Sequence, residues 1–158
     1  MLNKYIITFL ISMVPIVELR GAIPIAIHMG VPPLPAYVIA VIGNMLPVPF
    51  IYFFARKVLE WGQDRPVIGR FFTFCLVKGA HGGEKLKAKA GRGLFVALML
   101  FVGIPLPGTG AWTGTLAASL LNMGFKESSV AVMLGVLIAG VIMGLASMGV
   151  FGALNVLF

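Results

Sequence analysis

Residues 94–123 read LFVALMLFVGIPLPGTGAWTGTLAASLLNM, an apolar stretch that is broken in its middle. The break extends from Gly103 to Gly110. Its two prolines lack backbone N–H donors and its glycines permit positive φ, so a helix does not continue through it. Before the break stand only nine residues, 94–102, too few to cross the hydrocarbon core of a bilayer. The stretch therefore predicts two short helices joined by an irregular turn.

The composition of the chain is that of an integral membrane protein. Apolar residues make up 59% and charged residues 11% of its 158 residues, against roughly 45–50% and 25% in soluble domains. The net charge of +7 is concentrated, because nine of the twelve Lys and Arg residues lie between Arg56 and Arg92. A basic loop between apolar runs is the positive-inside signal. We therefore expect residues 56–93 to lie in the cytoplasm, at a plasma (inner) membrane, and not to bind nucleic acid.

Residues 5–29 repeat the broken pattern. Their apolar run is interrupted by Glu18-Leu19-Arg20-Gly21 and resumes at Ala22. We expect this segment to belong to the mature protein, because no small-x-small cleavage site follows the run. Irregular backbone at membrane depth is tolerated only where it is buried in protein or lines a wet cavity. We therefore predict that 5–29 and 94–123 are re-entrant helical hairpins; two full, Pro-kinked spans are the alternative.

Residues 34–55 and 130–158 predict two full spans; the first, as helix, is about 33 Å long. Each half of the chain then holds one hairpin and one span. The halves start from opposite faces of the membrane, the inverted-repeat arrangement of many transporters. The predicted fold is an all-α membrane protein with both termini external and an amphipathic helix at 66–78 in the linker. If the hairpins span fully, both termini are cytoplasmic.

Glu18 and Arg20 are the charged residues of an otherwise apolar stretch. A charge at bilayer depth costs at least ~2.5–3.5 kcal/mol on insertion scales, so it faces the bundle interior, where it pairs or marks a pathway. A functional role and a structural ion pair that locks the turn are both open. Asn44, in the middle of the 34–55 span, either lines the same cavity or ties neighbouring helices by a hydrogen bond.

The second break offers groups that bind anions. Thr109 and Thr113 carry hydroxyls and Trp112 carries an indole N–H donor, although packing or interfacial anchoring of the indole is an equal alternative. If a helix restarts at Ala111, its N-terminus favours negative charge. Across from it we expect Arg20, whose planar guanidinium suits phosphate. The sequence thus predicts a binding site for an anionic headgroup.

Two strings, residues 18–24 (ELRGAIP) and 104–114 (IPLPGTGAWTG), resemble the signature stretches of the small multidrug export protein family, a distant relative of the DedA (VTT-domain) superfamily. The resemblance covers nearly the whole chain and implies opposed re-entrant hairpins in a transporter-like fold. The related superfamily is associated with lipid translocation; this chain is shorter and lacks its multiple-acid signature. With the motif residues included, the candidate substrate site comprises Glu18, Arg20, Pro24, Asn44, Pro105, Pro107, Gly108, Thr109, Gly110, Trp112 and Thr113.

Three functions are compatible with these residues. The first is a transporter or lipid translocase that binds an anionic, phosphate-bearing lipid or small molecule between the hairpins, with proton coupling through Glu18. The second is an exporter of lipophilic cations that uses Glu18 as the cation site. The third is a non-transporting scaffold that docks partners through the basic segment 78–92.

An enzyme is not expected. The sequence holds no metal-ligand spacing, nucleophile–base pair, phosphate loop or dinucleotide fingerprint, so we expect neither a cofactor nor a metal. The single cysteine, Cys75, reads as a buried thiol. Two spans make a thin wall around a pathway, so we expect a homo-oligomer, most simply a dimer. Close helix contact there is permitted by a glycine series, namely Gly135, Gly140, Gly144 and Gly149.

Overall fold

The computed structural model describes residues 2–66, 69, 70, 73, 77, 93–106 and 108–157. Every regular element in this part of the chain is a helix, as the sequence predicted. The helices are α1 (Leu2–Met13), α2 (Glu18–His28), α3 (Pro33–Met45), α4 (Val48–Gln63), α6 (Gly93–Gly103), α7 (Ala111–Leu120) and α8 (Phe125–Leu157). Most of the amphipathic helix predicted at 66–78, and the basic segment 78–92, lie outside the described residues.

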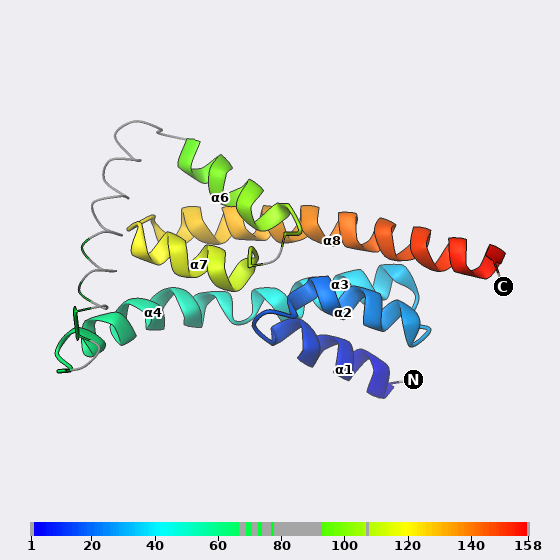
Figure 1. The fold of residues 1–158 in the computed structure, drawn as a ribbon, viewed down its shortest axis with the longest axis horizontal. Coiled ribbons are helices and arrows are strands. Elements are labelled where there is room, and N and C mark those ends of the chain that lie inside the picture. Colours follow the sequence, from blue (N-terminus) through cyan, green and yellow to red (C-terminus); the bar gives the residue numbers. More distant parts are fainter. Residues whose placement is uncertain are drawn as a thin grey trace.

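The helices form two hairpins that point toward one another (Figure 1). α1 runs inward from the end of the molecule that holds the N-terminus, and α2 returns to that end. α3 and α4 lead to the opposite end, from which α6 runs inward and α7 returns. α8 then runs back and brings the C-terminus to the same end as the N-terminus. Both hairpin tips therefore lie near the middle of the molecule.

The tip of the first hairpin lies earlier in the chain than the sequence indicated. α1 ends at Met13 and α2 begins at Glu18, so the predicted break at residues 18–21 is wrong. The helix is interrupted at Pro15, which lacks an N–H donor, and at Ile16, whose φ is +78°. Charged side chains do not by themselves break a helix. Glu18 and Arg20 therefore belong to the first turn of α2.

The tip of the second hairpin lies where the sequence predicted. α6 ends at Gly103 and α7 begins at Ala111. Within the turn, Gly108 has a φ of +81° and Gly110 a φ of +150°, conformations that are open to glycine and costly for other residues. Pro107 lies outside the described residues.

Within the described part of the chain, two stretches are long and apolar enough to cross a membrane: Pro33–Gln63 with 31 residues and Phe125–Gly149 with 25. The first is longer than the predicted 34–55, and a two-residue turn at Leu46 and Pro47 divides it into α3 and α4. Pro47 and Pro49 lack the N–H groups that a continuous helix needs there. α8 begins at Phe125 and not at 130, so the polar residues that follow Gly124 form its first turn.

The two hairpins pack in matched ways. α1 packs on α2 and α3, and α6 packs on α7 and α8. α1 comes close to a glycine of α3, and α6 comes close to a glycine of α8. A Cβ on Gly43 would lie 2.7 Å from the Phe9 carbonyl oxygen, and a Cβ on Gly135 would lie 2.7 Å from the Val102 Cβ. Small residues thus let the helix backbones approach closely, as membrane helices do.

The glycine series of α8 only partly fits the predicted dimer contact. Gly135 faces Val102 of α6, and Gly140 faces the ring of Tyr37 on α3, 2.5 Å from where its Cβ would be. Both glycines therefore serve packing within the chain. A Cβ on Gly144 or Gly149 would meet nothing within 4 Å, so only these two positions remain candidates for contact with a second copy.

Buried residues of α2, α3, α4, α6, α7 and α8 form one main core cluster. It includes Leu19 and Ile23 of α2, Val102 of α6 and Val136 of α8, all almost fully buried. The outer surface is also apolar. Among the residues that the structure describes, thirty large hydrophobic side chains are exposed, including those of Phe50, Phe53, Phe54 and Leu145. A soluble monomer rarely exposes apolar patches on this scale, and lipid accommodates them.

Candidate substrate site

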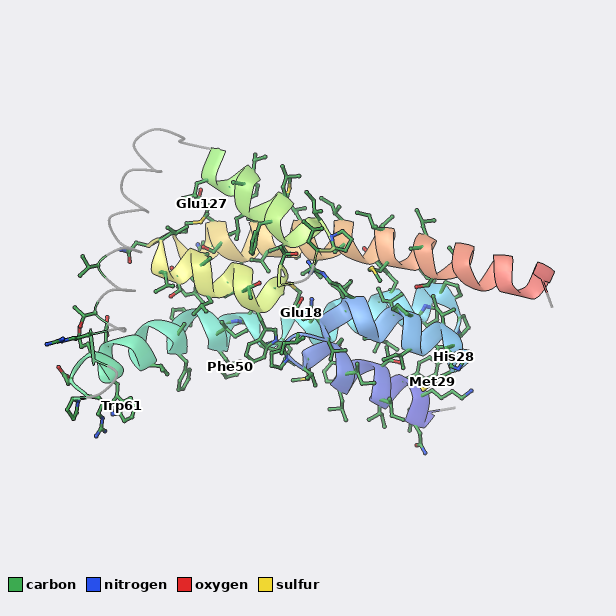
Figure 2. The ribbon with its side chains drawn as sticks, viewed as in Figure 1. Glu18, His28, Met29, Phe50, Trp61 and Glu127 are labelled. Atoms are coloured by element: carbon green, nitrogen blue, oxygen red, sulfur yellow. The ribbon has the colours of Figure 1, made fainter. Side chains whose placement is uncertain are left out.

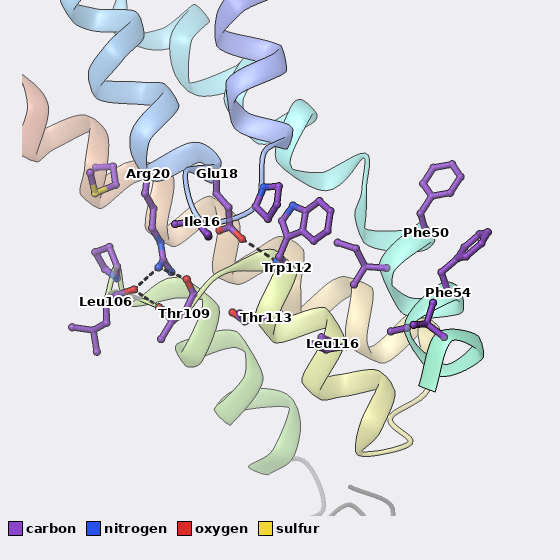
Figure 3. A pocket seen from close by; sticks show the side chains of 17 residues that line it. Ile16, Glu18, Arg20, Phe50, Phe54, Leu106, Thr109, Trp112, Thr113 and Leu116 are labelled. Carbon is purple, nitrogen blue, oxygen red and sulfur yellow. Dashed lines mark hydrogen bonds between the residues drawn. The ribbon is translucent and has the colours of Figure 1, made fainter. Parts of the chain in front are cut away.

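A cavity of about 950 Å³ lies where the two hairpin tips meet α4 (Figure 3). Pockets of this size, mostly apolar with a few convergent polar groups, are typical of small-molecule sites. Glu18 and Arg20 supply the charged groups of the wall. The remaining lining residues are Pro15, Ile16, Phe50, Ile51, Phe54, Ala55, Val58, Pro105, Leu106, Gly108, Thr109, Trp112, Thr113, Leu116 and Met143.

The Glu18 carboxylate caps the N-terminus of α7. Its Oε2 accepts a hydrogen bond from the backbone N–H of Ala111 (3.2 Å), and its Oε1 accepts one from the N–H of Trp112 (3.0 Å). These N–H groups have no partner within their own helix, and the helix dipole favours negative charge there. The sequence had placed Arg20 opposite this helix end. Arg20 does reach this turn, at the Thr109 carbonyl directly before the N-cap Gly110, but the anion position at α7 is held by the carboxylate of Glu18.

The Arg20 guanidinium binds the other end of the same turn. Its Nη1 donates to the carbonyl oxygens of Leu106 (2.6 Å) and Thr109, and its Nη2 donates to those of Val102 (3.1 Å) and Ile104 (3.3 Å). The last carbonyls of a helix lack partners within it and carry the negative end of its dipole. A cation is therefore stabilised where α6 ends. Glu18 and Arg20 join the two hairpins instead of locking the turn of the first.

Gly110 makes room for the Glu18 carboxylate. A Cβ at this position would lie 2.1 Å from Oε2 and 2.6 Å from the carboxyl carbon, well inside van der Waals contact. Gly108 has no such neighbour, since a Cβ there would meet nothing within 4 Å. The two glycines of the turn thus differ. Gly108 supplies backbone conformation only, whereas Gly110 also supplies space.

The polar side chains of the second tip make local contacts. The Trp112 indole N–H donates to the Met13 carbonyl (3.1 Å) at the end of α1, a third link between the tips. The Thr109 hydroxyl donates to the carbonyls of Ile104 and Leu106 (2.9 Å each), and the Thr113 hydroxyl donates to that of Gly110 (3.5 Å). The two hydroxyl oxygens retain lone pairs to accept from a ligand.

Three described residues of the predicted site, Pro24, Asn44 and Gly110, are not among those that line the cavity. Pro24 lies inside α2, one turn beyond Arg20. Asn44 is 1% exposed, and neither its amide nitrogen nor its amide oxygen has a hydrogen-bond partner among the described residues. Pro105 lines the cavity, and Pro107 lies outside the described residues.

Sequence reasoning missed the α4 wall of the cavity. Phe50, Phe54 and Val58 line it and recur at the four-residue spacing that places side chains on one helix face. That spacing was visible in the sequence. It did not stand out because the opposite faces of the segment are apolar as well. Figure 2 places Glu18 near the middle of the molecule and Trp61, at the end of α4, far from it.

Among the described residues no three His, Cys, Asp or Glu side chains are grouped so that they could hold a metal ion. The site consists of an apolar wall, one carboxylate, one guanidinium and the backbone of an irregular turn.

Interrupted helices whose tips meet at an amphipathic cavity, inside a bundle with a lipid-compatible surface, are the form of a membrane transport protein. A family model agrees. The chain belongs to the family described as "Putative small multi-drug export protein", whose model matches residues 18–142 and so begins at Glu18 and includes both charged residues and the whole second tip. No curated protein and no solved structure matches the chain.

Proposed function

We propose that the protein is a membrane transporter that moves an amphipathic, phosphate-bearing substrate, either a lipid or a small molecule. The observation that carries the proposal is the make-up of the cavity wall, which combines many apolar side chains with the polar side chains of Arg20, Thr109 and Thr113. An apolar chain would lie along Phe50 and Phe54 of α4. Its headgroup would reach these polar side chains, since hydroxyls and a guanidinium bind phosphate oxygens.

The headgroup has to compete for Arg20. The guanidinium already donates to four backbone carbonyls, so an anion gains it only as those bonds weaken. Charge-assisted hydrogen bonds to phosphate are stronger than bonds to neutral carbonyls. Binding and rearrangement of the tip are therefore linked in this proposal.

The membrane placement is part of the proposal. The hairpins would enter the bilayer from opposite sides and meet near its midplane. The basic linker would lie in the cytoplasm because of its Lys and Arg content, and both termini would be external. Figure 1 supports this, since both termini lie at one end of the molecule and α4 runs to the other.

A lipophilic cation is the second candidate substrate, and one observation favours it. Glu18 lines the same cavity as the aromatic side chains of Phe50, Phe54 and Trp112. Aromatic faces and a carboxylate attract organic cations. In this alternative, the cation draws Glu18 away from the N-terminus of α7.

Purified protein in liposomes that contain a fluorescent phosphate-bearing lipid tests the first proposal. We expect wild-type protein to move the probe between leaflets and Arg20→Ala to lose most of that activity. Lys126→Ala, an exposed cation at the start of α8, is the matched control and should retain it. Probe movement by Arg20→Ala at the wild-type rate would contradict a headgroup site at Arg20.

The same liposomes loaded with a fluorescent lipophilic cation test the alternative. Cation efflux by wild type and by Glu127→Gln, but not by Glu18→Gln, together with no movement of the lipid probe, would replace the first proposal with the second. If wild-type protein moves neither probe, neither substrate class is correct.

A further inference from the structure

The bonds of Glu18 to α7 and of Arg20 to the end of α6 are here named the latch. We propose that the latch is the gate of the transporter: it holds the two hairpin tips together and has to open in each transport cycle. The gating role rests on the proposed function, whereas the mechanical role of the latch does not.

The latch joins elements that are far apart in the sequence through complementary charges. Glu18 carries the negative charge that the α7 N-terminus favours, and Arg20 the positive charge that the α6 C-terminus favours. Both residues lie in the first turn of α2, and their partners lie on either side of one turn. A single displacement of α2 against that turn therefore breaks both contacts together.

The first tip is held in a strained backbone conformation. Ile16 has a φ of +78° and Glu18 a φ of +49°, a region that residues with a Cβ rarely adopt and that is least favourable for β-branched side chains. The Ile16 side chain is 97% exposed, so its own packing does not offset the strain. Contacts elsewhere must hold the tip, and the latch and the Trp112–Met13 bond do so. Release of the latch would let this strain relax.

The cavity gives the substrate access to the latch. Glu18, Arg20, Thr109 and Trp112 all line it, and Figure 3 shows both charged side chains turned toward the turn of the second hairpin. A polar group bound beside these residues is within reach of the same donors and acceptors that the latch uses. Substrate binding and opening of the tips thus act on one set of bonds.

The separation of the tips can be measured directly with spin labels at Ile16→Cys and Leu106→Cys, in a Cys75→Ser background. The two side chains are 97% and 55% exposed and lie on opposite tips, so they tolerate labels. We expect one short distance for otherwise wild-type protein. Glu18→Gln and Gly110→Ala should shift the ratio of latched to open molecules about tenfold toward open, equivalent to ~1.4 kcal/mol. Gly110→Ala keeps both charges and tests geometry alone.

Glu127→Gln, an acid outside the cavity, is the matched control and should keep the wild-type distance. Unchanged distances in both Glu18→Gln and Gly110→Ala, in protein that remains folded by circular dichroism, would overturn the latch.

Gating is tested on the same cysteine pair with a reducible bifunctional thiol cross-linker. Bridging the tips should stop movement of the phosphate-bearing lipid probe, and dithiothreitol should restore it. Transport at full rate with the tips bridged would overturn the gate. If wild-type protein, with Ile16 and Leu106 intact, moves no probe, the proposed function fails, while the distances still decide whether the latch exists.

Discussion

Both hairpin tips contain polar groups that need hydrogen-bond partners, but the groups differ between the two tips. The first tip is short, spans Val14 to Val17, and is followed by two charged side chains. The second is longer, from Ile104 to Gly110, and offers mainly backbone N–H and C=O groups at two helix ends. One tip therefore supplies side-chain charge and the other supplies unpaired backbone dipoles. Neither is satisfied alone, and a polar group left without a partner in apolar surroundings costs several kcal/mol.

The comparison explains why such polar segments are tolerated inside an apolar protein. A buried charge usually needs a counter-ion. Here each charge is bonded to the helix end of opposite polarity, and the donors and acceptors of the turn are used in the process. The same hydrogen bonds provide partners for the charged side chains of the first tip and for the backbone groups of the second. A substitution at either tip should therefore weaken the contacts of both tips.

Arg20→Ala should have the largest effect on stability. It leaves carbonyl acceptors near the end of α6 without their donor and Glu18 without a neighbouring positive charge. We expect a loss of roughly 3 kcal/mol in the free energy of unfolding. Denaturation by SDS in mixed micelles measures it. Arg20→Lys, a point charge with three donors, should fall between alanine and wild type; equal stability of all three proteins would show that the carbonyl contacts are not made.

Comparing Gly110→Ala with Gly108→Ala separates two effects in the second tip: the room that a glycine leaves for a neighbouring side chain, and the positive φ that it adopts. Both residues adopt positive φ, but only Gly110 faces the Glu18 carboxylate. We expect Gly110→Ala to cost about 1–3 kcal/mol more than Gly108→Ala. The same SDS titration measures the difference. A larger cost at Gly108 would place the carboxylate elsewhere.

Trp112→Phe tests the third link between the tips. Phenylalanine keeps an aromatic side chain on the cavity wall but removes the N–H that donates to Met13. The loss should be ~1 kcal/mol, the usual net value of one hydrogen bond, seen as a small decrease in the thermal midpoint in detergent. No decrease would indicate that the indole serves only as part of the wall.

Ile16→Gly should have the smallest effect, and it should be stabilising. Glycine adopts the φ of this position without steric cost, and the isoleucine side chain contributes little packing because it is exposed. We expect a gain of less than about 1 kcal/mol, since the freer unfolded chain offsets part of the relief. A marked loss of stability would show that Ile16 packs against the cavity and is not strained.

The sequence was most informative where the residue type by itself restricts the backbone conformation. The prolines and glycines of 103–110 located the second tip correctly, because they exclude helix whatever surrounds them. The first tip was misplaced by a few residues, because the charges of Glu18 and Arg20 were taken to mark the break when Pro15 makes it. A charged side chain shows that a segment is unusual, but a missing N–H shows where the helix stops.

The sequence predicted most of the residues of the candidate site, but it did not predict the contacts between them. Glu18, Arg20, Thr109, Trp112 and Thr113 were identified from the sequence and all line the cavity. Which charge meets which helix end was not predictable, because it depends on how α2 is rotated against α6 and α7. The α4 wall was missed because its side chains are chemically like the lipid-facing ones around them.

The hairpin tips meet inside the membrane only if each hairpin enters and leaves on one side of it. Reporters fused to the N-terminus and, in a second protein, to the C-terminus test this in intact cells, together with an accessible tag in the basic linker. We expect both termini outside and the linker in the cytoplasm. Termini and linker on the same side would contradict this, because the two broken segments would then be full spans and their tips would not meet in this way.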